Sequence, residues 1–144
     1  AVEKPYIETL LAEWKLYTDL FESKPNVREI HLGGGTPTFF SPEHLTELIN
    51  GIKATANIAP NASLGFEANP RTTRWEHLKT MAELGFTRLS LGIQDFDPVV
   101  QKAIHRVQSF EQVKTVTDWA RELGYTSINF DLIYGLPFQT VQSI

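Results

Sequence analysis

The sequence has 144 residues, of which 42% are hydrophobic, and this is enough for one compact domain with a sizeable core. The formal net charge is −4 and no basic run occurs, which argues against nucleic acid or an anionic membrane as a partner. The sequence has no cysteine, so these residues supply neither disulfides nor thiolate metal ligands. It shows neither a signal peptide nor an apolar run of membrane-spanning length, which predicts a cytoplasmic protein.

The first third of the chain predicts two helices with a strand between them. Apolar residues at helical spacing indicate a helix over Pro5–Ser23, and a strand is expected over Val27–Leu32. Ser41 is suited to the N-cap of a second helix and Pro42 to its first position. This helix is expected to end near Asn57.

The middle of the chain repeats the pattern of a strand followed by a helix. The second strand is expected over Leu64–Ala68. Thr73 and Glu76 resemble a capping box, which predicts a helix that ends at Leu84, with Gly85 as its stop.

The last third of the chain predicts two more strands. The third strand is expected over Thr87–Ile93, and Asp97 begins a short helix after it. A longer helix is expected within Ser109–Gly124, where Ser109 and Gln112 have capping-box spacing. The fourth strand is expected over Thr126–Tyr134.

Alternation within the strands indicates the architecture. In the third strand, apolar residues alternate with small or polar ones, namely Leu89, Leu91 and Ile93 against Ser90, Gly92 and Gln94. Central strands of a doubly wound sheet are apolar on both faces, whereas these strands have one polar face. We therefore predict an α/β fold, a partial parallel β/α barrel with about four β/α units around a polar lumen.

Four strands do not close a barrel, and a (β/α)₈ domain typically needs about 250 residues. We therefore expect residues 1–144 to be a fragment of a longer catalytic core. Its exposed strand edges predict marginal stability or self-association.

A glycine run follows the first strand directly. Gly33, Gly34 and Gly35 precede Thr36 and Pro37, and without Cβ atoms they let a ligand approach the main chain closely. The run lacks the spaced third glycine of a dinucleotide fingerprint and the Gly-Lys-Ser/Thr of a phosphate P-loop. We predict a ligand-contacting loop of another kind.

Polar side chains follow the later strands. Glu67, Gln94 and Asp131 fall on the predicted polar face, so we expect them to converge on one cavity at the carboxyl ends of the strands. Arg106 lies in a loop after the third strand, and its guanidinium suits a ligand carboxylate. The four histidines show no metal-ligand spacing and structural roles are expected, although His31 is a candidate for the lumen face.

Four segments of the chain together carry a family resemblance. They are His31–Thr38, Glu67–Arg71, Arg88–Phe96 and Asn129–Pro137. In this order they closely resemble the oxygen-independent coproporphyrinogen-III oxidases, which are radical S-adenosylmethionine enzymes. The resemblance implies a (β/α)₆ partial barrel with a four-iron four-sulfur (4Fe-4S) cluster and two molecules of S-adenosylmethionine. It also implies oxidative decarboxylation of coproporphyrinogen III to protoporphyrinogen IX in haem biosynthesis, with an external electron donor.

The resemblance assigns cofactor contacts position by position and leaves catalytic residues unassigned. It puts the first S-adenosylmethionine against Gly34 and Glu67. It puts the second against a larger set, namely Gly35, Thr36, Gln94, Arg106 and Asp131. The implied chemistry is cleavage of S-adenosylmethionine to a radical that takes hydrogen from the substrate propionate.

Two departures from the family pattern limit the expectation. The family holds its cluster through a C-x-x-x-C-x-x-C loop, and this chain has no cysteine. We expect that loop to lie upstream of Ala1 and the chain alone to be inactive. The other departure is Asn69, where many members have aspartate.

Two alternatives stay open. The first is a haem-chaperone relative that binds haem without oxidase activity, although the Gln94–Phe96 and Leu132–Gly135 forms favour the oxidases. The second is a β/α-barrel glycosidase that uses Glu67 and Asp131, which would leave the glycine loop unexplained.

Overall fold

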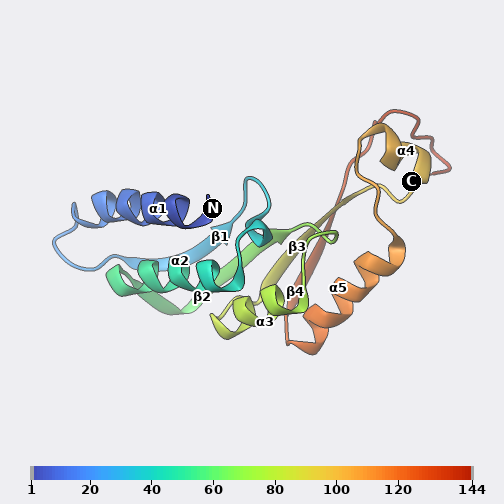
Figure 1. Cartoon of the computed structure of the whole chain (residues 1–144). Helices are drawn as coiled ribbons and strands as arrows, with labels where there is room; N and C mark the ends of the chain where they lie inside the picture. The colour runs from blue at the N-terminus through green and yellow to red at the C-terminus, as the bar shows by residue number, and fades with distance from the viewer. Residues whose placement is uncertain (1, 144) are drawn as a thin grey trace.

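The computed structural model describes residues 2–143, and in it four parallel strands form one sheet (Figure 1). The strands follow each other in the order β1-β2-β3-β4, with the bounds Asn26–Leu32, Asn57–Ala68, Arg88–Gln94 and Ser127–Leu132. Parallel neighbours in sequential order are the arrangement of one arc of a β/α barrel. The predicted α/β class with a parallel sheet is confirmed.

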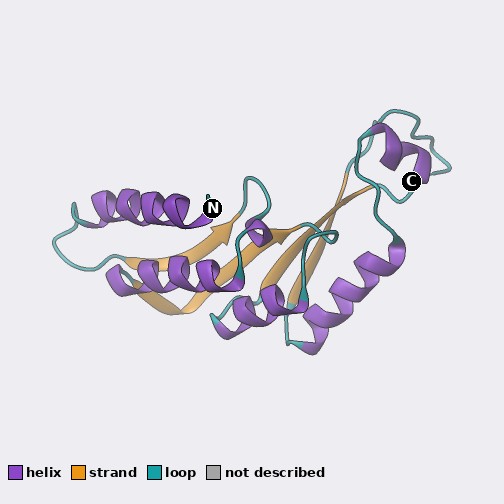
Figure 2. Cartoon of the chain, viewed as in Figure 1, coloured by secondary structure: helices purple, strands orange, loops and turns teal. Residues whose placement is uncertain are grey.

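Helices connect the strands and gather on one side of the sheet (Figure 2). Their bounds are Glu3–Thr18 for α1, Pro42–Thr55 for α2, Trp75–Glu83 for α3, Pro98–Ala103 for α4 and Phe110–Glu122 for α5, with a 3₁₀ turn η1 over Pro37–Phe39. Helices α2, α3 and α5 supply buried residues to the core against the sheet, and α1 packs beside α2. Helix α4 lies beyond the ends of β3 and β4, near the last described residues (Figure 1). None of the helices within residues 2–143 has the length and apolar character needed to cross a membrane.

The core lies between the helices and the apolar face of the sheet. Phe66 is fully buried in β2, with its ring edge-on to Phe86 at 5.9 Å and to Tyr125 at 6.1 Å between centroids. The Tyr125 hydroxyl donates a hydrogen bond of 2.8 Å to the Leu78 carbonyl, so its polar end is satisfied where it is buried. Complete burial of a side chain such as Phe66 contributes about 1.5–3 kcal/mol.

The two faces of the sheet differ as the alternation predicts. In β3, Leu89, Leu91 and Ile93 are buried toward the helices, whereas Ser90 and Gly92 are partly exposed on the opposite face. The opposite face therefore remains available for polar groups.

Local capping signals set the starts of three helices. Ser41 Oγ accepts from the His44 N–H at 3.3 Å, and Asp97 caps α4 through the Val99 N–H at 2.7 Å. Ser109 and Gln112 form a reciprocal capping box at α5. These predictions are confirmed.

The capping box predicted at Thr73 and Glu76 is wrong. Helix α3 begins at Trp75, and the N–H of its N-cap, Arg74, donates to His77 Nδ1 at 3.1 Å. The Thr73 hydroxyl instead donates to the Asn69 carbonyl at 2.8 Å, because the chain is still turning after β2. A turn that closes on Asn69 has replaced the predicted cap.

The boundaries of β2 also differ from the prediction. The strand begins at Asn57 rather than at Leu64 and pairs with β1 from its first residue. The first half of β2 contains Pro60, and because proline disfavours strands, the sequence did not predict a strand there. The sheet accommodates it where the pairing register shifts, between Val27 and Glu29 of β1.

Two further elements are shorter than predicted. Helix α1 ends at Thr18 rather than Ser23, and β4 ends at Leu132 rather than Tyr134. Asp131 still lies within β4, so neither difference changes the predicted position of a site residue.

Candidate functional site

The carboxyl ends of the strands surround a polar cavity of about 120 Å³. Its lining comes from all four strands and their loops, namely Gly35, Thr36, Glu67, Ala68, Asn69, Gly92, Gln94, Arg106 and Asp131. Every predicted site residue except Gly34 is in this set. The predicted convergence of Glu67, Gln94 and Asp131 is therefore present in the structure.

Gly34 lies on the other side of the glycine loop. Its φ of +82° is in the left-handed region, which glycine adopts without strain. It lines a separate, larger cleft of about 470 Å³ between α1, the loop and η1, which Gly35 and Thr36 also border. The loop thus presents one side to the polar cavity and the other to this cleft.

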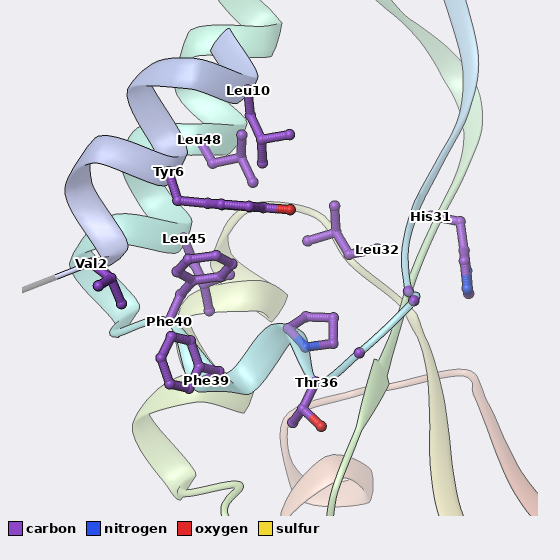
Figure 3. A pocket seen from close by; sticks show the side chains of 14 residues that line it. Val2, Tyr6, Leu10, His31, Leu32, Thr36, Phe39, Phe40, Leu45 and Leu48 are labelled. Atoms are coloured by element: carbon purple, nitrogen blue, oxygen red, sulfur yellow. The ribbon is translucent and has the colours of Figure 1, made fainter.

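The walls of the larger cleft are mostly apolar (Figure 3). Tyr6 of α1 stacks on Phe40, with ring centroids 5.6 Å apart, and Phe39 lies edge-on to Phe40 at 5.8 Å. His31 lies across β1 from these aromatic rings (Figure 3). The cleft therefore offers apolar contact, with its polar backbone concentrated in the glycine loop.

Glu67 extends from β2 toward His31 on the polar face. Its Oε1 is 3.5 Å from His31 Nε2, and both side chains are about half exposed, so this contact is a weak one. A Cβ atom at Gly33 would lie 2.9 Å from Glu67 Oε1 and 3.2 Å from His31 Nε2. A side chain at Gly33 would therefore require the ends of the Glu67 and His31 side chains to shift.

Gln94 has an unusual backbone conformation for a residue with a side chain. Its φ is +71°, and the Asp95 N–H donates to the Ile93 carbonyl at 2.9 Å, which makes a tight γ-turn at the end of β3. The pairing between β3 and β4 shifts register at the same point. This turn sets the direction in which the Gln94 side chain leaves the strand.

Arg106 and Gln94 lie together over Gly92. A Cβ atom at Gly92 would be 3.2 Å from both Gln94 Nε2 and Arg106 Nη2. Within residues 2–143, buried Gln94 Oε1 and Arg106 Nε find no hydrogen-bond partner. Leaving a buried polar atom unpaired costs about 1–3 kcal/mol, so a polar ligand that supplied partners would bind favourably.

Asp131 completes the cavity from β4. It pairs with Gly92 in the sheet register, which places it beside the Gln94 and Arg106 pair, and it is exposed. The cavity thus combines acidic groups at Glu67 and Asp131 with a guanidinium and an amide. This donor set fits a ligand that carries both an ammonium and a carboxylate group, as the methionine part of S-adenosylmethionine does.

Three lining residues, Ala68, Asn69 and Gly92, were not among the predicted site residues. Asn69 is buried, and its Oδ1 accepts from the Arg71 N–H at 3.1 Å, a bond that aspartate would make equally well. Gly92 is small enough for Arg106 to approach. Its place in the polar alternation of β3 was the signal that could have identified it.

A metal cluster does not fit these residues. In the described part of the chain no three His, Asp or Glu side chains are grouped to hold a metal ion, and the sequence has no cysteine. A four-iron cluster is held by thiolates, which these residues do not supply.

A parallel β/α sheet with a glycine loop and a polar cavity at its strand ends defines a β/α protein that binds its ligand at that edge. Comparison with family models identifies which one: the chain belongs to the radical SAM superfamily, whose model matches residues 2–144. Membership implies use of S-adenosylmethionine and a 4Fe-4S cluster. The resemblance found in the sequence is confirmed.

Curated relatives are similar over nearly the whole chain. The oxygen-independent coproporphyrinogen III oxidase of Bradyrhizobium diazoefficiens is 45% identical over 138 residues, which cover 96% of this chain and 31% of that protein. The enzyme of the same name from Helicobacter pylori is 47% identical over 136 residues, covering 94% of this chain and 30% of that protein.

A solved structure is also similar. The coproporphyrinogen III oxidase of Escherichia coli, described as a radical SAM enzyme, superposes with a TM-score of 0.92 at 35% identity. The match covers 98% of this chain and 32% of that one. The chain therefore spans about a third of the length of these relatives.

Proposed function

We propose that this chain is the part of an oxygen-independent coproporphyrinogen III oxidase that binds S-adenosylmethionine. The observation that carries the proposal is the polar cavity, in which residues from four strand ends meet and in which buried polar atoms of Gln94 and Arg106 lack partners. The oxidase relatives, which match over more than nine-tenths of this chain, support the same function.

Each side chain has a binding role in this proposal. The Arg106 guanidinium donates to the ligand carboxylate, whereas Gln94 Oε1 accepts from the ammonium or a ribose hydroxyl, as do Glu67 and Asp131 through charge-assisted hydrogen bonds. Thr36 and the Gly35 main chain complete the cradle. The bound cofactor supplies hydrogen abstraction, while these residues orient it and shield it from water.

Two cofactor molecules are part of the proposal. The first lies against Gly34 and Glu67, and the second against Gly35, Thr36, Gln94, Arg106 and Asp131. Of these residues only Gly34 lies outside the polar cavity and borders the larger cleft, whereas Glu67 lines the cavity together with the second set, so the two sets adjoin at the glycine loop.

The reaction proposed for the whole protein is oxidative decarboxylation of two propionate groups of coproporphyrinogen III to vinyl groups in haem biosynthesis. It needs an external electron donor, and we place it in the cytoplasm without nucleic acid or a membrane as partner. The cysteine loop expected outside residues 1–144 remains a prediction. Membership of the radical SAM superfamily removes the glycosidase alternative, and no feature of the structure favours a haem chaperone over the oxidase.

The binding site is tested with a matched pair of carboxylate variants. Glu67→Gln should weaken S-adenosylmethionine binding to the chain about tenfold, since it removes a charged acceptor worth about 1.5–3 kcal/mol. Glu29 lies on the same face of the sheet, in the middle of β1 and outside both cavities, so Glu29→Gln should leave the affinity unchanged. Isothermal titration calorimetry measures both, and equal affinities of the two variants would contradict the site.

The reaction is tested with a chimera. Residues 2–143 replace the matching third of the Escherichia coli oxidase, which then supplies the cysteine loop. Under anaerobic conditions with a reductant, the chimera should convert coproporphyrinogen III to protoporphyrinogen IX. A folded chimera that carries its cluster and cleaves no S-adenosylmethionine would contradict the proposal, and one that binds haem without turnover would favour the chaperone.

A further inference from the structure

We propose that Gln101 and Gln108, two buried glutamines outside the cavity, are positioning residues that fix Gln94 and Arg106 for ligand binding, and that the half-buried Gln139 acts with them. The inference rests on the proposed function, because it concerns how the same cavity keeps its shape. Gln101 and Gln108 are almost completely buried, at 3% and 4% exposure, and neither lines the cavity.

The turn at Gln94, with which these glutamines form hydrogen bonds, is strained. The γ-turn at Gln94 has a positive φ, and turns of this form are rare because they cost free energy. Such a conformation persists only where the surrounding structure enforces it. Something beyond β3 itself must therefore fix the turn.

Hydrogen bonds to three successive carbonyls supply that restraint. Gln108 Nε2 donates to the Ile93 carbonyl at 2.8 Å, and Gln101 Nε2 donates to the Asp95 carbonyl at 2.8 Å. Between them, the Gln94 carbonyl accepts from the Ile133 N–H at 3.0 Å. Every carbonyl of the turn thus has a donor from outside β3.

Gln101 also holds the loop that carries Arg106. Its Oε1 accepts from the Gln108 N–H at 3.1 Å, and its carbonyl accepts from the Arg106 N–H at 2.8 Å. His105, just before Arg106, has a φ of +54°, so this loop is bent as well. One residue of α4 therefore fixes both the turn of Gln94 and the loop of Arg106.

A third glutamine ties the segment after β4 to the same turn. Gln139 Nε2 donates to Asp95 Oδ2 and, at 2.8 Å, to the Ile133 carbonyl. Asp95 Oδ1 in turn accepts from the Asp97 N–H at 2.6 Å. The segment that follows Asp131 is thereby held against the end of β3.

These contacts distinguish positioning from simple stabilisation. An apolar core would fill the same space without the cost of burying amides, and that cost is present here, because Gln108 Oε1 is buried without a partner within residues 2–143. The side-chain amides of Gln101 and Gln108 form hydrogen bonds with the turn that carries Gln94 and with the loop that carries Arg106. Their loss should therefore change ligand affinity more than it changes folding.

The test uses the ¹⁵N-labelled chain, S-adenosylmethionine as the probe, and a matched control. Gln101→Met keeps the side-chain volume but removes the donor and the acceptor, and should lower affinity about tenfold while the Gln94 and Arg106 amide signals shift. Gln112→Ala removes a glutamine hydrogen bond at the exposed cap of α5 and should keep affinity within about twofold. Gln139→Ala, at a half-buried position, decides the test if Gln101→Met does not fold, and it should lower affinity about threefold.

The inference is overturned if the folded Gln101→Met variant binds as tightly as the parent chain, if its Gln94 and Arg106 signals do not move, or if Gln112→Ala loses as much affinity. If Gln139→Ala has to decide, unchanged affinity overturns it. In each of these outcomes the parent chain still binds, and the proposed function survives. A parent chain that binds no S-adenosylmethionine would overturn the proposed site and this inference together.

Discussion

Gln94 combines a costly backbone conformation with a side-chain oxygen that has no partner among residues 2–143. Strain of this kind at a ligand site is removed by substitution with glycine, which tolerates positive φ. Gln94→Gly should therefore raise the free energy of unfolding by about 1 kcal/mol while S-adenosylmethionine binding is lost. Gln94→Ala is the matched control, because it loses the same side chain but keeps the strain. Urea denaturation of both variants checks this, and a glycine variant no more stable than the alanine variant would count against a strained turn.

His77 gives the fold a dependence on pH. Burial lowers the pKa of its imidazole below the ordinary 6.5, and the nearby Arg74 charge lowers it further, while a hydrogen bond to the Phe40 backbone and the charges of Glu76 and Glu3 oppose this. The neutral ring also accepts the Arg74 N–H at Nδ1, which a protonated ring could not do. The folded chain therefore resists taking up this proton.

The sign of the effect follows from linkage. Above pH 6.5 the ring is neutral in both the folded and the unfolded chain, so His77 does not lower the free energy of unfolding there. As the pH falls below 6.5 the unfolded chain takes up a proton that folded His77 does not, so stability falls by at most about 1.4 kcal/mol per pH unit. Denaturation of the parent chain and of His77→Gln between pH 7 and pH 5 measures this. Equal slopes for the two proteins would contradict the assignment to His77.

At the scale of elements, α1 and α2 touch at Gly51. A Cβ atom there would lie 2.5 Å from Leu11 Cδ2, so Gly51→Ala should push the helices apart and cost about 1 kcal/mol of unfolding free energy. In a Leu11→Ala background the clash is gone, and Gly51→Ala should instead stabilise by about 1 kcal/mol through helix propensity. Thermal denaturation of the four proteins of this cycle checks the change of sign. A Gly51→Ala effect that is the same in both backgrounds would mean that α1 does not pack there.

Elements whose signals are local were predictable from the sequence. Ser41, Asp97 and Ser109 cap their helices through bonds to residues two or three positions away, so the signals lie within one turn of chain. The Thr73 prediction failed although its contact is also local, because the turn after β2 uses the hydroxyl for the Asn69 carbonyl, four residues back. The start of β2 failed because pairing with β1 outweighs the local effect of Pro60.

The site was predictable in part for the same reason. Strand alternation placed Glu67, Gln94 and Asp131 on one face, and parallel strands bring such residues to one edge. The separation of Gly34 from this cavity depends on how the loop folds back, which spacing does not encode. The hydrogen bonds of Gln101 and Gln108 connect α4 and the loop after it to the end of β3, and no periodic pattern in the sequence predicts them.

At the scale of the whole molecule, the edge of the sheet at β4 exposes apolar surface. Phe130 and Leu132 are 45% and 61% exposed and border an apolar cleft of about 400 Å³ with residues of α5. Exposed apolar patches and free strand edges promote association, as expected from the sequence. The Phe130→Lys/Leu132→Lys variant should be more monomeric than the parent chain in sedimentation velocity at equal concentration. An unchanged distribution would show that this edge does not drive association.

The central claim is that the ends of four strands form one site for S-adenosylmethionine. Its most direct test is titration of the ¹⁵N-labelled chain with S-adenosylmethionine, followed by amide chemical shifts. The account predicts saturable changes at the residues that border the cavity, namely Gly35, Thr36, Glu67, Gln94, Arg106 and Asp131. Changes confined to surfaces away from the glycine loop, or no change at saturating ligand, would contradict it.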